Sequence, residues 1–231
     1  SKASKAFGRD SQLHDTSFGW RFINPRLDEV YGTDGMGETA ENLVDQYGIS
    51  REDQDAFAAW SQQKAAQSAA ERGEECVSVS IPRRKQDPLV FSDDEFVKPQ
   101  TTVEGLSRLR PAFRPSGTVT AGNASGLNDG AAALLLASES GLAKHGLTAM
   151  TRICSSAVVG VEPRIMGIGP VGASRLALER AGLKLSDMDL IELNEAFAAQ
   201  ALACTRTLGL DDFDPRVNPQ GGAIALGLPL G

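Results

Sequence analysis

The sequence predicts an α/β protein in which helices cover a mostly parallel β-sheet. In the second half of the chain, apolar strand-like segments alternate with longer amphipathic segments that have the spacing of helices. Residues 151–161 and 185–194 are predicted strands, and residues 171–183 and 195–209 are the helices expected to follow them. Such alternation favours parallel strands, because each helix carries the chain back to the starting edge of the sheet. With 231 residues, of which 41% are hydrophobic, the chain can bury one or two compact cores.

A helical hairpin is predicted in the first half of the chain. Residues 38–48 form a short predicted helix that ends at Gly48, since glycine favours the left-handed conformation found at helix ends. Ser50 then begins an S-x-x-D capping motif at the start of a longer helix rich in Ala and Gln, which we expect to end near Gly73. The preceding residues 1–37 are rich in Gly, Pro, Asp and Asn and predict turns and short extended pieces.

The region after this hairpin predicts a strand, a polar surface and a loop. Residues 76–82 alternate apolar residues with serines, as in a half-buried strand, and Pro82 ends it. Residues 91–115 are polar and interrupted by prolines, with a brief helix at 102–109, and they predict a functional surface region. Residues 117–138 begin as a short strand and continue as a Gly/Asn/Ser loop, and their final apolar run is compatible with either a strand or a buried helix.

Two features concern how the chain is divided and where it stops. Residues 145–150 are the predicted junction between two α/β units. We expect both ends to be unfinished, because the first residue is not Met and the glycine-rich segment 217–231 stops where a helix is expected to follow.

The charge and cysteine content exclude several classes of protein. The 23 basic and 30 acidic residues give a net charge of -7, which disfavours sequence-independent binding to nucleic acid. A membrane span or a secretion signal is not expected, because apolar runs of about 18 residues and a basic-then-apolar start are both lacking. Cys76, Cys154 and Cys204 are widely spaced and odd in number, so we expect neither a disulfide framework nor a metal site. A reducing, cytoplasmic setting fits best.

Asn194 and Glu195 are the first candidates for chemistry. They lie at the carboxyl end of a predicted strand, where open α/β sheets place their ligands. The Asn194 amide can hold a water or an oxyanion there, beside the positive end of a helix dipole. The alternative is that Asn194 is only a helix N-cap and Glu195 a first-turn carboxylate, and the local pattern favours that alternative.

Two loops are candidates for binding. Residues 120–130 offer Ser125 and several backbone amides, which suit a pantetheine chain or the edge of a nucleotide. The glycine-rich segment 217–231 lets the backbone pass close to a ligand. The alternative for residues 120–130 is an elaborate turn without a ligand. The alternative for residues 217–231 is a tight packed turn, and it is favoured because the glycine spacing matches neither a G-x-G-x-x-G nor a Walker motif.

Other polar residues have simpler interpretations. The basic residues 83–85, with Lys98 beyond them, can meet phosphates, but short basic runs are usually solvated loop faces. His14 and His145 have neither metal-ligand spacing nor an adjacent acid, so no role is assigned to them. Cys204 lies in an Ala-rich helix face, and we expect it to be a buried structural cysteine.

Five motifs together resemble the thiolase family in order and spacing. They span essentially the whole chain, and NEAFAAQ and GNASGLNDGAA are highly specific. The segments QLHDTSFGWRFINP and YGTDGMGETAEN resemble the bacterial 3-oxoadipyl-CoA branch of the family. The motifs are MGETAEN (36–42), TVTAGNASGLNDGAAALLLAS (118–138), MGIGP (166–170), LIELNEAFAAQ (190–200) and VNPQGGAIALG (217–227).

The resemblance implies a fold and a set of contacts with coenzyme A. It implies a layered α/β fold, here incomplete, with an inserted loop domain. Residues 1–140 would be the later part of the N-terminal domain, including the loop domain, and residues 146–231 the first part of the C-terminal domain. Coenzyme A would be a substrate, with no resident cofactor, and the full-length family implies a homo-oligomer. The implied contacts are Ser125 near the pantetheine with Ala124 and Leu127 beside it, Met36, Phe113 and Met166 as apolar walls, and Lys98 facing the nucleotide end.

The implied reaction uses two cysteines, one as nucleophile and one to move a proton on the α-carbon of acetyl-CoA. By resemblance, neither is present, because Cys76, Cys154 and Cys204 lie outside both motifs. Asn194 would position a water in the oxyanion hole. Leu228 occupies the place of the family's histidine, and leucine has neither a proton to donate nor a lone pair.

Three hypotheses follow. The first is an acyltransferase of the thiolase family that cleaves or condenses 3-oxoacyl-CoA, with 3-oxoadipyl-CoA in the breakdown of aromatic compounds as the expected substrate, and with no activity from this chain by itself. The second is a non-catalytic protein that binds coenzyme A or another subunit, motivated by Leu228 and the absent cysteines. The third treats the chain as an incomplete gene in which Leu228 is a sequence error.

Overall fold

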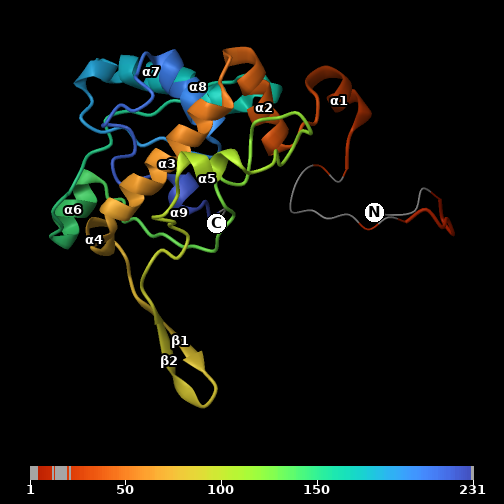
Figure 1. Cartoon of the computed structure of the whole chain (residues 1–231). Coiled ribbons are helices and arrows are strands. Elements are labelled where there is room, and N and C mark those ends of the chain that lie inside the picture. Colours follow the sequence, from red (N-terminus) through yellow and green to blue (C-terminus); the bar gives the residue numbers. More distant parts are fainter. Residues whose placement is uncertain (1–4, 12, 14–19, 21, 230–231) are drawn as a thin grey trace.

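The computed structural model describes residues 5–11, 13, 20 and 22–229, and it consists mainly of helices joined by long extended segments (Figure 1). No helix of this described part is long and apolar enough to cross a membrane. In chain order the elements are α1 (Pro25–Tyr31), α2 (Met36–Tyr47), α3 (Arg51–Gln67), α4 (Ala69–Gly73), β1 (Val79–Arg83), β2 (Gln86–Phe91), α5 (Val103–Ser107), α6 (Glu139–His145), the 3-10 helix η1 (Pro163–Ile168), α7 (Gly169–Ala181), the 3-10 helix η2 (Leu185–Asp187), α8 (Ala198–Leu208) and α9 (Ala223–Leu226).

The predicted helical hairpin is confirmed by α2 and α3. Gly48 ends α2 in the left-handed conformation, with φ of 62° and ψ of 44°. The Ser50 side chain then caps α3 by accepting a hydrogen bond from the Asp53 backbone N–H at 3.0 Å. The second helix ends earlier than expected, at Gln67, and the separate short helix α4 reaches Gly73.

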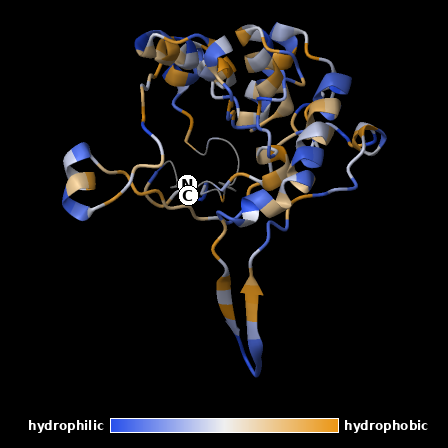
Figure 2. Ribbon diagram, turned by 90° about the vertical axis from the view of Figure 1, so that its left-hand side faces the viewer, coloured by the Kyte–Doolittle hydropathy of each residue, from blue (hydrophilic) through white to orange (hydrophobic). Residues whose placement is uncertain are grey.

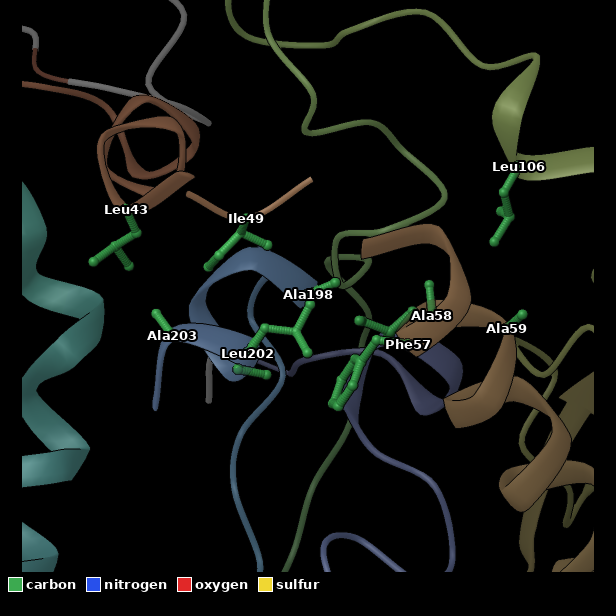
Figure 3. Close-up of a cluster of buried hydrophobic side chains, with 11 residues drawn as sticks. Leu43, Ile49, Phe57, Ala58, Ala59, Leu106, Ala198, Leu202 and Ala203 are labelled. Carbon is green, nitrogen blue, oxygen red and sulfur yellow. The ribbon is translucent and has the colours of Figure 1, made fainter. Parts of the chain in front are cut away.

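The core lies where α2, α3 and α8 meet (Figure 3). Phe57 of α3, Leu43 of α2 and Leu202 of α8 are the large side chains at its centre, each at most 1% exposed. Burying one such side chain contributes about 1.5–3 kcal/mol. Small alanines along α8, including Ala198 and Ala203, let its backbone approach the neighbouring helices closely. The core therefore holds the amino end of α8 in a fixed position.

The predicted strand after α4 is present but its predicted half-burial is wrong. β1 pairs with β2 in an antiparallel hairpin, and every residue of both strands is exposed. Figure 2 shows the hairpin projecting away from the helices, with hydrophobic residues along its strands and hydrophilic residues at its tip. Alternation of apolar residues predicts a strand, but burial also needs a second layer, and none of the described elements packs on this hairpin. Residues 83–85 are exposed as expected.

The predicted parallel strands do not form as regular strands in the described part of the chain. Residues 151–161 have no regular secondary structure, and 185–194 contain only η2 and one isolated bridge. That bridge pairs Ile191 with Val217 in parallel. The apolar run after the Gly/Asn/Ser loop is neither strand nor helix, and its three leucines are 75–91% exposed. A strand needs neighbouring strands for its backbone N–H and C=O groups, and the described residues supply no ladder to these segments.

Three further expectations differ from the structure. The turns expected before residue 37 include the helix α1, which Asn24 caps by accepting from the Arg26 backbone N–H. Helix α6 follows Ser138 and was not expected from sequence. The predicted helix over 195–209 begins at Ala198 instead, with Phe197 as its N-cap residue.

Candidate functional site

The Gly/Asn/Ser loop lies between two other motifs and is hydrogen-bonded to both. On one side, the Ser125 backbone N–H donates to the Ala196 carbonyl at 3.0 Å, and the Ala198 N–H donates to the Asn123 carbonyl at 2.8 Å. On the other side, the Leu228 N–H donates to the Gly126 carbonyl at 2.8 Å. Three segments that are far apart in the sequence are thereby held side by side.

Asn123 fixes the shape of this loop from inside. Its side-chain oxygen accepts from the Thr120 N–H at 2.7 Å, and its amide nitrogen donates to Asp55 Oδ1 at 2.9 Å. Asp55 is 1% exposed and is paired with Arg51, its i–4 neighbour on α3, at 2.7 Å. Because every one of these polar groups is paired, the loop is anchored to α3 in one conformation.

Glu195 anchors the second motif and is 0% exposed. Its carboxylate accepts from the Ser61 hydroxyl at 2.6 Å, from the Asn218 side-chain amide at 2.8 Å and from the Ile224 backbone N–H at 3.3 Å. Gly222 lies so close to this carboxylate that a Cβ at that position would overlap it. Glu195 therefore joins α3, the segment before α8 and the glycine-rich segment. The alternative that Glu195 is a first-turn carboxylate is wrong, because α8 starts three residues later, at Ala198.

Asn194 is exposed, precedes α8 and is not its N-cap residue. The N-cap alternative favoured by local pattern is therefore wrong, since tertiary packing places the helix start at Ala198. Leu228 is partly buried and follows Gly227, whose φ of 89° lies in the left-handed region. The structure thus brings the Asn194 and Leu228 segments to opposite sides of residues 123–128.

The predicted apolar walls fall into two neighbouring groups. Met36 and Met166 line one cavity of about 630 Å³. Phe113 packs edge-on against Phe197, with ring centroids 5.9 Å apart, and lies against Gly37, directly after Met36. The three predicted wall residues are 42–52% exposed, so part of each side chain is open to solvent.

The remaining predicted contacts lie along the loop itself. Ala124 is 8% exposed, whereas Leu127 is 50% exposed beside the partly buried Ser125. Lys98 is exposed, and its Nζ lies 4.7 Å from the centroid of the Phe96 ring, which packs against Gly126. Through Phe96, Lys98 is thus connected to Gly126 in the Gly/Asn/Ser loop.

A buried lysine lies beneath the glycine-rich segment. Lys64 on α3 is 8% exposed, its Nζ donates to the Val217 carbonyl at 2.8 Å, and it lies 3.2 Å from the centroid of the Trp60 ring. Burial lowers the pKa of Lys64 from 10.5 to about 8, although the negative charges of Glu195 and Glu192 act in the opposite direction. Sequence reasoning missed this residue and the role of Glu195, because only long-range packing makes them buried.

The cysteines do not form a reactive centre in the described part of the chain. Cys204 is 0% exposed and its thiol donates to the Gly167 carbonyl at 3.2 Å. Burial raises the pKa of this thiol to about 11, which disfavours the thiolate. The expectation of a buried structural cysteine is confirmed.

Cys76 and Cys154 are exposed free thiols, and His145 is exposed, whereas His14 lies outside the described residues. Across the described ranges, no group of three or more His, Cys, Asp or Glu side chains has a geometry that could hold a metal ion.

Comparison with known proteins identifies the family. The family model described as "Thiolase, N-terminal domain" matches residues 3–140, and the one described as "Thiolase, C-terminal domain" matches residues 147–231. The chain belongs to the thiolase family, and it has part of the layered α/β fold of that family. The resemblance inferred from the five motifs is thereby confirmed.

Individual relatives agree with this assignment. The chain is 56% identical over 232 residues to a beta-ketoadipyl-CoA thiolase of Acinetobacter baylyi, and 56% identical to the 3-oxoadipyl-CoA/3-oxo-5,6-dehydrosuberyl-CoA thiolase of Escherichia coli. Both alignments cover 100% of this chain and 58% of the relative, so the chain spans little more than half their length. The crystal structure of the Bacillus anthracis acetyl-CoA acetyltransferase matches 97% of this chain and 56% of its own, with a TM-score of 0.82 and 44% identity. Human mitochondrial 3-ketoacyl-CoA thiolase matches 88% of this chain and 51% of its own, with a TM-score of 0.78 and 46% identity.

Proposed function

We propose that this chain is part of an acyltransferase that cleaves or condenses 3-oxoadipyl-CoA, and that it supplies the coenzyme-A-binding face of that enzyme. The observation that carries the proposal is the pairing of residues 123–128 with the Ala196–Ala198 backbone on one side and with Leu228 on the other. The names of the 56% identical relatives support the substrate. Coenzyme A is a substrate in this proposal, and no resident cofactor is invoked.

Each binding residue has a proposed task. Ser125 lies near the pantetheine amides, and Ala124 and Leu127 pack beside that chain. Met36, Phe113 and Met166 form the apolar walls, and Lys98 faces the nucleotide end. Their partial exposure and the contacts that link them support a single extended binding surface. An apolar surface with a few placed polar groups is typical of such ligand sites.

Asn194 is proposed to hold the water of an oxyanion hole, and its exposure leaves its amide available for that task. Leu228 cannot complete the hole, because its side chain donates no hydrogen bond. Loss of one oxyanion donor typically costs about 10²–10³ in rate. Together with a buried Cys204, this leads us to propose that the chain by itself does not turn over substrate.

Two measurements on the purified chain test this function. We expect no turnover of 3-oxoadipyl-CoA with coenzyme A, and saturable binding of coenzyme A by calorimetry. Replacement Leu127→Glu places a charge against the pantetheine and should weaken binding at least about tenfold. Leu147→Glu is the matched control, since Leu147 is similarly exposed but lies in another segment. Enzyme-like turnover would overturn the proposed inactivity, and no saturation at millimolar coenzyme A would overturn the binding role.

A second candidate is a non-catalytic protein that binds coenzyme A or another subunit. Leu228 favours it, because by resemblance an aliphatic side chain stands here where the family has a histidine. The flanking gene sequence separates the candidates: a cysteine loop before residue 1 and a C-x-G loop after residue 231 support the enzyme, and repeat sequencing at codon 228 tests for an error.

We further propose a cytoplasmic setting and a homo-oligomeric enzyme acting in aromatic breakdown. Localisation of the native protein, sedimentation and growth on aromatic substrates test these three proposals in turn.

A further inference from the structure

The cavity that holds Met36 and Met166 is mostly apolar, and two charged side chains, Asp34 and Arg164, also line it. The cavity of about 630 Å³ lies between α1, the amino end of α2 and η1. Tyr31 adds an aromatic wall, and Arg164 of η1 is the basic residue of the lining. This volume lies within the range of about 300–1,000 Å³ typical of small-molecule sites. The proposed function leaves Arg164 without a role.

The geometry of Arg164 leaves one end of its guanidinium available. Its Nε donates to Asp34 Oδ2 at 3.0 Å, whereas none of the hydrogen bonds of the described residues uses its two terminal nitrogens. The side chain is 52% exposed. Asn42 holds the pair in place, because its amide donates to Asp34 at 2.8 Å and to the Arg164 carbonyl at 3.0 Å. The two terminal nitrogens of such a fixed guanidinium match the two oxygens of a carboxylate.

The backbone beside Arg164 is shaped to accept this side chain. Gly32 has φ of 71°, and a Cβ there would lie 3.3 Å from Arg164 Cδ. A larger residue at position 32 would therefore press on the arginine stem. At Gly35, which also lines the cavity, a Cβ would meet nothing within 4 Å, so space remains at the entrance of α2.

We propose that Arg164 binds the terminal carboxylate of the acyl chain and selects dicarboxylic over monocarboxylic acyl thioesters. The acyl group of a 3-oxoadipyl thioester ends in a carboxylate that is separated from the thioester by a short carbon chain. The methionine and tyrosine walls suit that carbon chain. The Arg164 guanidinium pairs with the terminal carboxylate, whose negative charge would be costly to bury without a positive partner. This inference rests on the proposed function, since it requires that coenzyme A thioesters bind this face.

A matched pair of ligands tests the proposal on the intact chain. Adipyl-CoA and hexanoyl-CoA have six-carbon acyl chains and differ in whether the far end is a carboxylate or a methyl group. We expect the wild-type chain to bind adipyl-CoA more tightly in calorimetric titrations. In Arg164→Gln we expect the ratio of the two dissociation constants to fall about tenfold, since a charge-assisted bidentate pair is lost.

Two further variants control the interpretation. Arg84→Gln removes the same charge at the tip of the β1–β2 hairpin, which Figure 1 shows far from α1 and α2, and it should leave the ratio unchanged. Asp34→Asn removes the competing negative charge while keeping the side-chain shape, and should increase the preference for adipyl-CoA. This gain of binding cannot arise from a misfolded chain.

The possible failures are distinguishable. If the wild type shows no preference between the two thioesters, Arg164 does not select the carboxylate and the inference is wrong. If Arg164→Gln weakens both thioesters and free coenzyme A equally, Arg164 contacts the coenzyme and the inference is again wrong. In both cases coenzyme A binding stands. If neither thioester nor coenzyme A binds at millimolar concentration, the proposed function and this inference are both overturned.

Discussion

Lys64 on α3 donates a hydrogen bond to the carbonyl oxygen of Val217 at 2.8 Å, which ties the central helix to the start of the glycine-rich segment. The same ammonium lies over the Trp60 ring and is largely removed from water. A charged lysine that is mostly buried costs stability unless its partners compensate fully. The lowered pKa of Lys64, about 8, indicates that compensation is incomplete.

This relationship predicts how stability depends on pH. The folded chain holds the Lys64 proton less tightly than the unfolded chain, whose lysine keeps a pKa near 10.5, so the unfolded state binds more protons between pH 8 and 10.5. The penalty of the buried charge is fully present below pH 8 and is relieved as the pH rises through this window. The Lys64 contribution to the free energy of unfolding should therefore increase with pH, by up to about 3 kcal/mol.

Replacement Lys64→Met isolates that contribution. Denaturant unfolding of both chains from pH 7 to 10.5 gives a difference curve in which the titration of other groups cancels. We expect the wild type to gain stability relative to the variant as the pH rises. A flat difference curve would show that Lys64 keeps an ordinary pKa in the folded chain.

Glu195 should be important for stability. Replacement Glu195→Ala leaves the Ser61 hydroxyl, the Asn218 amide and the Ile224 N–H without their buried acceptor. We expect a loss of about 2–4 kcal/mol in the free energy of unfolding. The control Glu179→Ala changes an exposed carboxylate on α7 and should cost less than about 0.5 kcal/mol. Equal losses of stability in the two variants would contradict the role of Glu195 as a buried anchor.

Gly227 should resist replacement. Its φ of 89° disfavours any side chain, and a Cβ would overlap the Asn128 side-chain oxygen. We expect Gly227→Ala to lower the free energy of unfolding by about 1–3 kcal/mol and to disturb the pairing of Leu228 with Gly126. Gly160→Ala, where a Cβ meets nothing within 4 Å, should be within about 0.5 kcal/mol of the wild type. Thermal unfolding of the two variants measures the contrast.

The three thiols should differ in reactivity. At pH 8 the exposed Cys76 and Cys154 should react readily with a thiol reagent, whereas Cys204 should react only after denaturation. Burial and a pKa raised to about 11 both suppress its thiolate. Mass spectrometry of the labelled chain identifies the modified residues. Rapid labelling of Cys204 in the native chain would mean that the α8 packing opens easily.

Local signals predicted α2, α3, α7 and α8 but missed α1 and α6, and most of the predicted strands did not form. The Ser50 cap and the Gly48 stop act within a few residues, so the α2–α3 hairpin could be derived from sequence. Residues 151–161 have the composition of a strand, but a strand forms only when other segments supply hydrogen-bonding partners. The true start of α8 at Ala198 also depends on long-range bonds, because Asn123 accepts from that residue.

The sequence by itself determined the family, through five motifs that all lie within the residues matched by the two family models, and it supplied Asn194 and Leu228 as candidate site residues. Only the tertiary structure decided that Glu195 is a buried anchor, that Lys64 is desolvated and that Arg164 lines a mostly apolar cavity. The physical reason is that motifs record residue type and separation along the chain. Burial, hydrogen-bond partners and pKa depend on which distant segments fold against a residue.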